Sequence, residues 1–232
     1  MINYPNKMKK EKTIIKSKER NYAKANLGDN FEKKINDSNS YYLSKGIACI
    51  YKKPTPVQIV KVDYPSRNKA KISEAYYKTP STTDYNGIYK GYHIDFEAKC
   101  CHSTSFALKN IFAHQVEHLN TVDKMGGIAF VLIEFPLHEE TFLLPAKTLY
   151  NKYIESLNGG RKSISYQTFK NEAYLIKTTY NPTIDYLKIV DILIEIEKNR
   201  WKSVFILFQI FYHHNHQDLV QYILFHLVFH LC

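Results

Sequence analysis

The sequence of 232 residues has little of several residue types that mark special classes of protein. Eight glycines and eight prolines are too few for a collagen-like or low-complexity chain. With 44% hydrophobic and 23% charged residues, the chain as a whole is not intrinsically disordered. A chain of this length can bury about 70% of the surface that it exposes when unfolded. The composition therefore indicates a globular protein with a substantial core.

Cysteines and long apolar runs are scarce as well. Cys49, Cys100, Cys101 and Cys232 form neither a CxxC motif nor a regular framework, which is typical of a reducing compartment. No apolar stretch follows the basic N-terminus as a secretory signal requires. The most apolar region, residues 204–231, is interrupted by polar residues before it reaches membrane-spanning length. We therefore expect a cytoplasmic protein without a membrane partner.

Positive charge is abundant, because 32 Lys and Arg residues stand against 22 Asp and Glu residues. This net charge of +10 favours an anionic partner such as nucleic acid. The first 24 residues alone contain eight basic and two acidic side chains. We expect a flexible basic arm over 1–26, a globular domain over 27–197, and an atypical apolar, His-rich tail over 198–232.

Hydrophobic periodicity predicts the main elements. A helix should begin at Asp29 or Asn30, and Asn86-Gly87 and Lys90-Gly91 are expected to form turns. The predicted strands are 47–51, 57–64, 71–77, 92–99, 128–135 and 141–144, the second and third forming a hairpin, and the later helices are 108–124 and 149–157.

The strand over 92–99 has two unlike faces. Because side chains alternate along a strand, Ile94, Phe96 and Ala98 point one way. Asp95, Glu97 and Lys99 point the other way, and such a charge cluster is costly to bury unless it is paired or binds metal. The alternative is an edge strand whose charged face is solvated.

Asp84, across the intervening turn, can face Glu97. Two carboxylates that stand about one metal-ion diameter apart would hold a hard divalent ion such as Mg²⁺ through their oxygens. The ion lowers the pKa of bound water, and the ammonium of Lys99 can orient that water or stabilise a developing oxyanion. This is a chemistry for phosphodiester hydrolysis.

The surrounding motifs carry a family resemblance. Residues 79–91 (TPSTTDYNGIYKG) followed by 94–99 (IDFEAK) closely resemble the signature of the RecU Holliday-junction resolvases, a branch of the PD-(D/E)xK nucleases. Thr83-Asp84 stands where the superfamily often has Pro-Asp. The resemblance covers roughly residues 26–195 and includes the segments 38–42, 52–56, 74–77, 105–110, 159–163 and 185–187.

The resemblance implies an α/β fold, an α+β mixed sheet flanked by helices, with a restriction-endonuclease-like core and a protruding β-hairpin stalk at about 57–78. It assigns catalysis to Asp84, Glu97 and Lys99, and it assigns Mg²⁺, with Mn²⁺ as a possible substitute, to Thr82, Asp84, Glu97 and Gln115. Glu32 matches an additional acid that the superfamily often has in its first helix. The domain over 27–197 would thus be a nuclease domain.

The implied activity is Mg²⁺-dependent, symmetric nicking of four-way DNA junctions during recombination and repair. The resemblance further implies a homodimer and an interaction with the RecA recombinase. In the stalk, Lys61, Arg67, Lys69, Lys71 and Lys78 would neutralise phosphates without reading sequence. The alternative for these side chains is a solvated hairpin tip.

Two other functions are open at this point. His114 and His118 lie in an HxxEH sequence, the inverted zinc-protease motif, although no third ligand is evident. A non-catalytic junction-binding or strand-annealing protein would need only basic and aromatic contacts to DNA. The tail from residue 199 has the composition of a frameshifted or late extension, a membrane-surface helix being the alternative.

Overall fold

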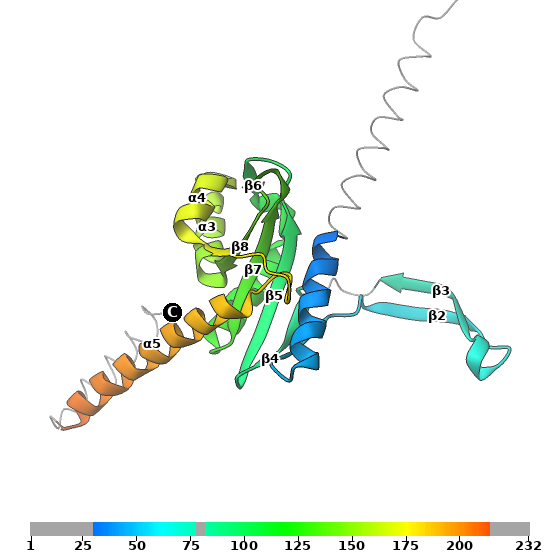
Figure 1. Ribbon diagram of the computed structural model, residues 1–232, viewed down its shortest axis with the longest axis horizontal. Helices are drawn as coiled ribbons and strands as arrows, with labels where there is room; N and C mark the ends of the chain where they lie inside the picture. Colours follow the sequence, from blue (N-terminus) through cyan, green and yellow to red (C-terminus); the bar gives the residue numbers. More distant parts are fainter. Residues whose placement is uncertain (1–29, 78–81, 214–232) are drawn as a thin grey trace, which may run out of the picture.

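The computed structural model describes residues 30–77 and 82–213 (Figure 1). Residues 30–44 form a first helix. The strands are β1 (Cys49–Lys52), β2 (Val57–Asp63), β3 (Lys71–Tyr77), β4 (Tyr85–Tyr89), β5 (Tyr92–Cys100), β6 (Ser105–Ala107), β7 (Ile128–Phe135), β8 (Glu140–Pro145), β9 (Ser163–Ser165) and β10 (Tyr174–Ile176). The later helices are α2 (Ala113–Lys124), α3 (Ala146–Leu157), α4 (Tyr166–Glu172) and α5 (Leu187–His213), and short 3-10 turns span Arg67–Lys69, Leu108–Asn110 and Pro136–His138.

A six-stranded sheet in the order β1-β4-β5-β7-β8-β10 organises the molecule. β5 and β7 are parallel and are joined through α2, whereas the other neighbouring pairs are antiparallel. The sheet is therefore mixed, as predicted. β5 lies between β4 and β7, so neither of its edges is free, and residues 94–98 are buried; the alternative of a solvated edge strand is therefore wrong.

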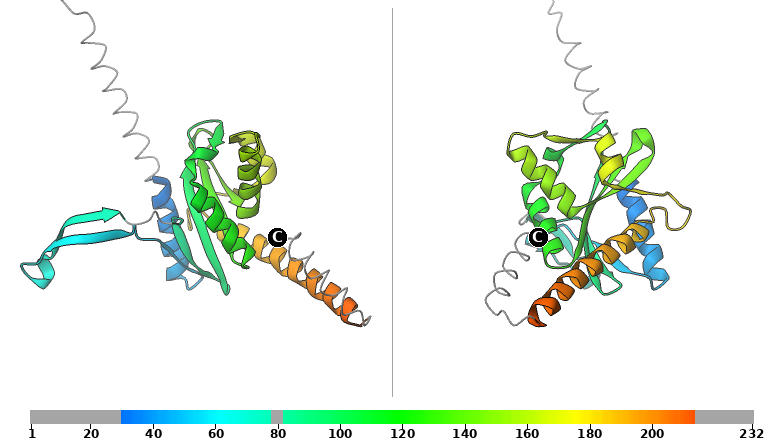
Figure 2. Two further views of the ribbon diagram at one scale, coloured as in Figure 1. Left: turned by 180° about the vertical axis from the view of Figure 1, so that it is seen from behind. Right: turned by 90° about the vertical axis from the view of Figure 1, so that its left-hand side faces the viewer.

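Helices cover both faces of this sheet (Figure 2). The first helix and the beginning of α5 pack on one face, where Phe31 and Val190 join a core with Phe96 and Phe130. α2, α3 and α4 cover the other face, where Leu119, Leu149 and Phe169 join Val131. The predicted alternation of β5 is confirmed, since Ile94, Phe96 and Ala98 all belong to the first core.

The hairpin of β2 and β3 stands away from this body (Figure 1). Every residue of its two strands is exposed, so no core holds it in place. A 3-10 turn at Arg67–Lys69 forms its tip. The predicted protruding hairpin is confirmed.

Two local predictions were wrong. Asn86-Gly87 is not a turn but lies inside β4, where a Cβ on Gly87 would come within 2.1 Å of the Cys49 carbonyl oxygen. The glycine is required by the close approach of β1, and the turn is made at Lys90-Gly91, both with positive φ. The helix predicted over 108–124 begins only at Ala113, after a separate 3-10 turn.

α5 runs from Leu187 to His213 without interruption, so the tail boundary predicted at 197/198 falls within one helix. Figure 1 shows this helix projecting from the body away from the hairpin. Among the described residues, no helix is long and apolar enough to cross a membrane. The predicted arm at 1–26 and the end of the tail lie outside the described residues.

Phe96 is the centre of the aromatic core beneath β5. Its ring stacks on Tyr85 and Phe130 at centroid distances of 4.8 and 4.9 Å. Replacing it by Ala (Phe96→Ala) should lower the free energy of unfolding by about 3–5 kcal/mol, because a cavity replaces these contacts. Urea denaturation measures this change. The control Tyr180→Ala, at a side chain 94% exposed, should leave stability nearly unchanged, and an equal loss in both variants would contradict the assignment.

Candidate active site

The two predicted catalytic acids meet where β4 and β5 pair. The antiparallel register sets Tyr85 opposite Phe96, so its continuation by one residue sets Asp84 opposite Glu97. Asp84 Oδ2 accepts a hydrogen bond from the Ala98 backbone N–H at 3.1 Å. This bond holds the Asp84 carboxylate against β5, on the strand that carries Glu97.

Glu97 is completely buried, on the sheet face that α2 covers. Burial raises the pKa of its carboxyl from the ordinary 4.5 to about 7; the charge of Lys99 opposes this rise and the charge of Asp84 adds to it. Both carboxylate oxygens lack a hydrogen-bond donor. Burial therefore disfavours the ionised form of Glu97 more than the charge of Lys99 favours it.

Lys99 is the closest cation to this carboxylate. Its Nζ lies 2.5 Å from Glu97 Oε1, in contact but not in hydrogen-bonding alignment, and its side chain is about one-quarter exposed. The period-two spacing of β5 puts both side chains on one face. Asp84, Glu97 and Lys99 thus form one cluster, as their sequence spacing suggested.

Asp95 is the third acid on this face and is surrounded quite differently. It is 1% exposed, and its Oδ2 lies 2.9 Å from Lys53 Nζ and 3.2 Å from His118 Nε2. The Thr83 hydroxyl donates to Oδ1, and His93 Nε2 lies 3.5 Å from Oδ2. We define Asp95, Lys53, Thr83 and His118 as the Asp95 cluster.

The alternation of residues 92–99 predicts the face on which Asp95 lies, but it does not reveal the rest of this cluster. Lys53 follows β1 and His118 lies on α2, so each is distant from Asp95 along the chain. The sequence held one signal for this cluster: a charged residue two positions before Glu97 needs cations or hydrogen-bond donors around it if it is buried. No spacing rule identifies which side chains provide them.

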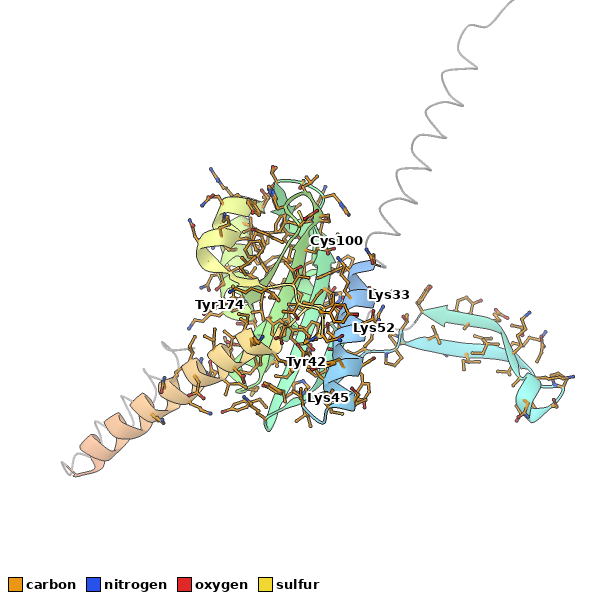
Figure 3. All side chains as sticks on the ribbon, in the orientation of Figure 1. Lys33, Tyr42, Lys45, Lys52, Cys100 and Tyr174 are labelled. Carbon is orange, nitrogen blue, oxygen red and sulfur yellow. The ribbon has the colours of Figure 1, made fainter. Side chains whose placement is uncertain are left out.

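The other predicted metal ligands occupy separate positions around the acids. Thr82 is exposed, and its hydroxyl oxygen accepts from Lys53 Nζ at 3.3 Å. Gln115 is 7% exposed, and its amide oxygen accepts from the Phe112 backbone N–H at 3.1 Å, capping α2. Glu32 forms an ion pair with Lys52, which Figure 3 labels between the first helix and the hairpin. The metal roles of Thr82 and Gln115 stay predictions, and so does the match of Glu32 to the additional acid of the superfamily.

The donor set of the cluster fits a hard divalent cation. Asp84 and Glu97 offer carboxylate oxygens, and both oxygens of Glu97 are buried without hydrogen-bond donors. A cation there would supply the missing positive charge, and Mg²⁺ and Mn²⁺ prefer such oxygen ligands. Two protein carboxylates suffice for Mg²⁺, because this ion keeps several waters when bound.

The soft-metal alternative has no support in the described part of the chain. There, no group of three or more His, Cys, Asp or Glu side chains is arranged to hold a metal ion, either at the HxxEH motif or around Asp84 and Glu97, which are two acids only. His118 of the HxxEH motif instead contacts the buried carboxylate of Asp95. Burial raises the pKa of the Cys100 thiol to about 12, so this thiol stays protonated.

The predicted DNA-contacting side chains lie on the hairpin. Lys61, Lys69 and Lys71 are exposed, and Figure 3 shows the hairpin side chains reaching into solvent away from the sheet. The backbone of Arg67 begins the 3-10 turn at the hairpin tip. Lys78 lies outside the described residues. The hairpin therefore presents lysines at a distance from the acids.

The raised pKa of Glu97 predicts an unusual stability profile. Because this pKa is higher in the folded protein than in the unfolded chain, its contribution to stability is complete below about pH 4.5 and is lost as pH rises through about 7. Between about pH 5 and 8, the metal-free protein should lose about 3 kcal/mol more stability than Glu97→Gln. Chemical denaturation at several pH values measures the difference.

Glu155→Gln, at an exposed carboxylate on α3, is the matched control and should follow the parent protein. Parallel pH profiles for the parent and Glu97→Gln would contradict the raised pKa.

Comparison with known proteins agrees with the motifs. The family model described as "Recombination protein U" (RecU) matches residues 26–192. "Holliday junction resolvase RecU" of Streptococcus gordonii is 50% identical over 191 residues, covering 82% of this chain and 94% of the relative. The protein of the same name from Bacillus cytotoxicus is 47% identical over 195 residues, covering 83% and 98%.

Among solved structures, Archaeoglobus fulgidus Hjc, a Holliday junction resolvase from an archaeal hyperthermophile, aligns with a TM-score of 0.33 and 15% identity. The alignment covers 51% of this chain and 77% of that one, a similarity too low to support a conclusion. The family model and the curated relatives span most of the chain, and on their evidence this protein belongs to the RecU family.

Proposed function

We propose that this protein is a divalent-metal-dependent endonuclease that cleaves four-way DNA junctions, the substrate named for its curated relatives. The observation that carries the proposal is the pairing of Asp84 with a buried Glu97 whose oxygens have no hydrogen-bond donor. A side chain in that state is costly to stability and is expected at a functional site. The activity in which such a pair of acids would act is phosphodiester hydrolysis.

Asp84 and Glu97 would hold a Mg²⁺ or Mn²⁺ ion, with Thr82 and Gln115 as further oxygen ligands. The bound ion would supply positive charge to a DNA phosphate and lower the pKa of a water. The Ala98 N–H orients the Asp84 carboxylate, and the sheet face around Glu97 excludes bulk water. These groups are therefore preorganised before any substrate binds.

Lys99 is suited to assist the attacking water or the phosphate oxygen that gains charge. Its ammonium contacts Glu97 Oε1 but is not in hydrogen-bonding alignment with it. Its side chain is partly exposed, so the ammonium can reach a phosphate without leaving the cluster. A cation beside developing negative charge stabilises the transition state more than the ground state.

The hairpin would contact the junction through its lysines. Its strands are exposed on both sides, so branched DNA can approach without disturbing a core. Contacts to phosphates would give affinity without sequence preference. Homodimerisation would provide the two active sites that symmetric nicking needs. That assembly, an interaction with RecA and action in the cytoplasm are parts of this proposal.

Removing either acid should separate cleavage from binding. Asp84→Asn and Glu97→Gln are expected to reduce nicking of a labelled four-way junction by more than about 100-fold, because each removes a charged metal ligand. Junction affinity without divalent metal should stay equal or increase, since less negative charge faces the DNA. Gel assays of nicking and of binding measure the two quantities.

Glu195→Gln is the matched control, because this carboxylate is exposed on α5 and pairs only with Lys198 within the described ion pairs. Its nicking should equal that of the parent. If Asp84→Asn and Glu97→Gln nick at the parent rate, the assignment is wrong. If the parent binds junctions but never nicks them with Mg²⁺ or Mn²⁺, the non-catalytic alternative is correct.

The hairpin lysines should dominate the salt dependence of binding. The triple variant Lys61→Ala, Lys69→Ala and Lys71→Ala should reduce the slope of log affinity against log salt by up to about 3, because each phosphate contact releases counterions. Fluorescence anisotropy with a four-way junction at several salt concentrations measures the slope. Affinity for this substrate should fall at every salt concentration tested.

The control triple variant removes three exposed lysines outside the hairpin, Lys147 on α3, Lys170 on α4 and Lys177 directly after β10. Figure 1 shows α3 and α4 on the side of the sheet away from the hairpin. The control variant carries the same change in net charge, so it corrects for a general electrostatic effect. Equal slopes for the two triple variants would exclude the hairpin as the main DNA contact.

A further inference from the structure

The hairpin is attached to the sheet at two adjacent points beside the candidate active site. Its outgoing strand starts four residues after Lys53, which follows β1 directly. Its returning strand leads back to residues 82–84, which precede β4. The Lys53 backbone N–H donates to the Asp84 carbonyl oxygen at 2.7 Å, so the two attachment points are bonded to each other.

Asp95 connects both attachment points to the central strand β5. Its Oδ2 accepts from Lys53 Nζ on the outgoing side, and its Oδ1 accepts from the Thr83 hydroxyl on the returning side. Lys53 Nζ also lies 2.5 Å from Thr83 Oγ1, closing a three-membered network. His118 adds a contact from α2.

The contrast between the two buried acids on β5 indicates separate roles. Asp95 and Glu97 lie two residues apart on one face and are almost equally buried. Both oxygens of Asp95 accept from the surrounding side chains, whereas neither oxygen of Glu97 has a donor. Both oxygens of Asp95 accept from side chains and two of its neighbours, Lys53 and His118, are basic, so its charge stabilises the donors around it.

We propose that Asp95 is a positioning residue that holds both ends of the hairpin against β5 and thereby fixes Asp84 opposite Glu97. Thr83 immediately precedes Asp84. A change in the position of Thr83 would therefore move the backbone of Asp84 and, with it, the Asp84 carboxylate. The network would keep the hairpin and the two metal-ligating acids in one geometry. This inference rests on the proposed function only for its cleavage readout.

A matched pair at Thr83 tests the network with little change in shape. Thr83→Val removes the hydroxyl and keeps the volume, whereas Thr83→Ser keeps the hydroxyl. We expect the affinity of the full-length protein for Mn²⁺ without DNA to fall about 10- to 100-fold in Thr83→Val, the usual effect of losing an orienting contact, and to stay within about threefold in Thr83→Ser. Isothermal titration calorimetry measures both.

The cleavage readout should show the same pattern. For nicking of a four-way junction, Thr83→Val should lower kcat by at least about tenfold and leave KM within about twofold, since the hairpin lysines remain. Asp95→Asn should change both readouts in the same direction as Thr83→Val. Thermal unfolding verifies that each variant is folded, and if Asp95→Asn does not fold, the Thr83 pair decides.

Equal Mn²⁺ affinities for the parent and Thr83→Val, or equal losses in Thr83→Val and Thr83→Ser, would overturn the proposed role of Asp95. A parent protein that binds Mn²⁺ but does not nick junctions would refute the proposed function alone, and the Mn²⁺ comparison would still decide the role of Asp95. A parent that binds no Mn²⁺ would overturn both proposals.

Discussion

The burial of carboxylates on a central strand is the constraint on which the rest of the structure depends. β5 is covered on both sides, so each acid on it must find positive charge or hydrogen-bond donors. Asp95 finds them within the protein, from Lys53, Thr83 and His118. Glu97 has the ammonium of Lys99 in contact with Oε1, yet burial keeps its pKa raised and neither of its oxygens has an aligned hydrogen-bond donor. β5 thus carries two kinds of acid. Asp95 accepts hydrogen bonds from protein side chains, whereas Glu97 would be stabilised by a bound cation.

The opposite face of β5 supports this arrangement. Phe96 lies between the two acids in sequence and stacks in the core with Tyr85 and Phe130. Tyr85 directly follows Asp84, so the aromatic stack and the acids of the candidate active site alternate on both paired strands. A dense core on one face therefore fixes the backbone that positions polar groups on the other.

The hairpin presents the opposite situation, because no core surrounds it. Its exposed side chains include Ile59, Ile72 and Tyr77, an apolar content that is unusual for a solvated element and common at binding surfaces. Such an element takes its orientation from its two attachment points. The attachment points are Lys53 and residues 82–84, a range that includes Asp84 itself. The proposed DNA contacts of the hairpin and the geometry of the two acids would therefore depend on the same attachment points.

The sequence by itself determined the alternation of β5, the hairpin and the grouping of Asp84, Glu97 and Lys99, because strand periodicity and short connections act over few residues. It did not identify Gly87 as a site of close approach, since this depends on where β1 packs. Nor did it indicate that Lys53 and His118 converge on Asp95, because they come from separate elements. The continuous helix across residue 198 was also hidden by a change in composition. Tertiary structure alone decided these features, since contacts between distant segments follow from packing, which no local pattern encodes.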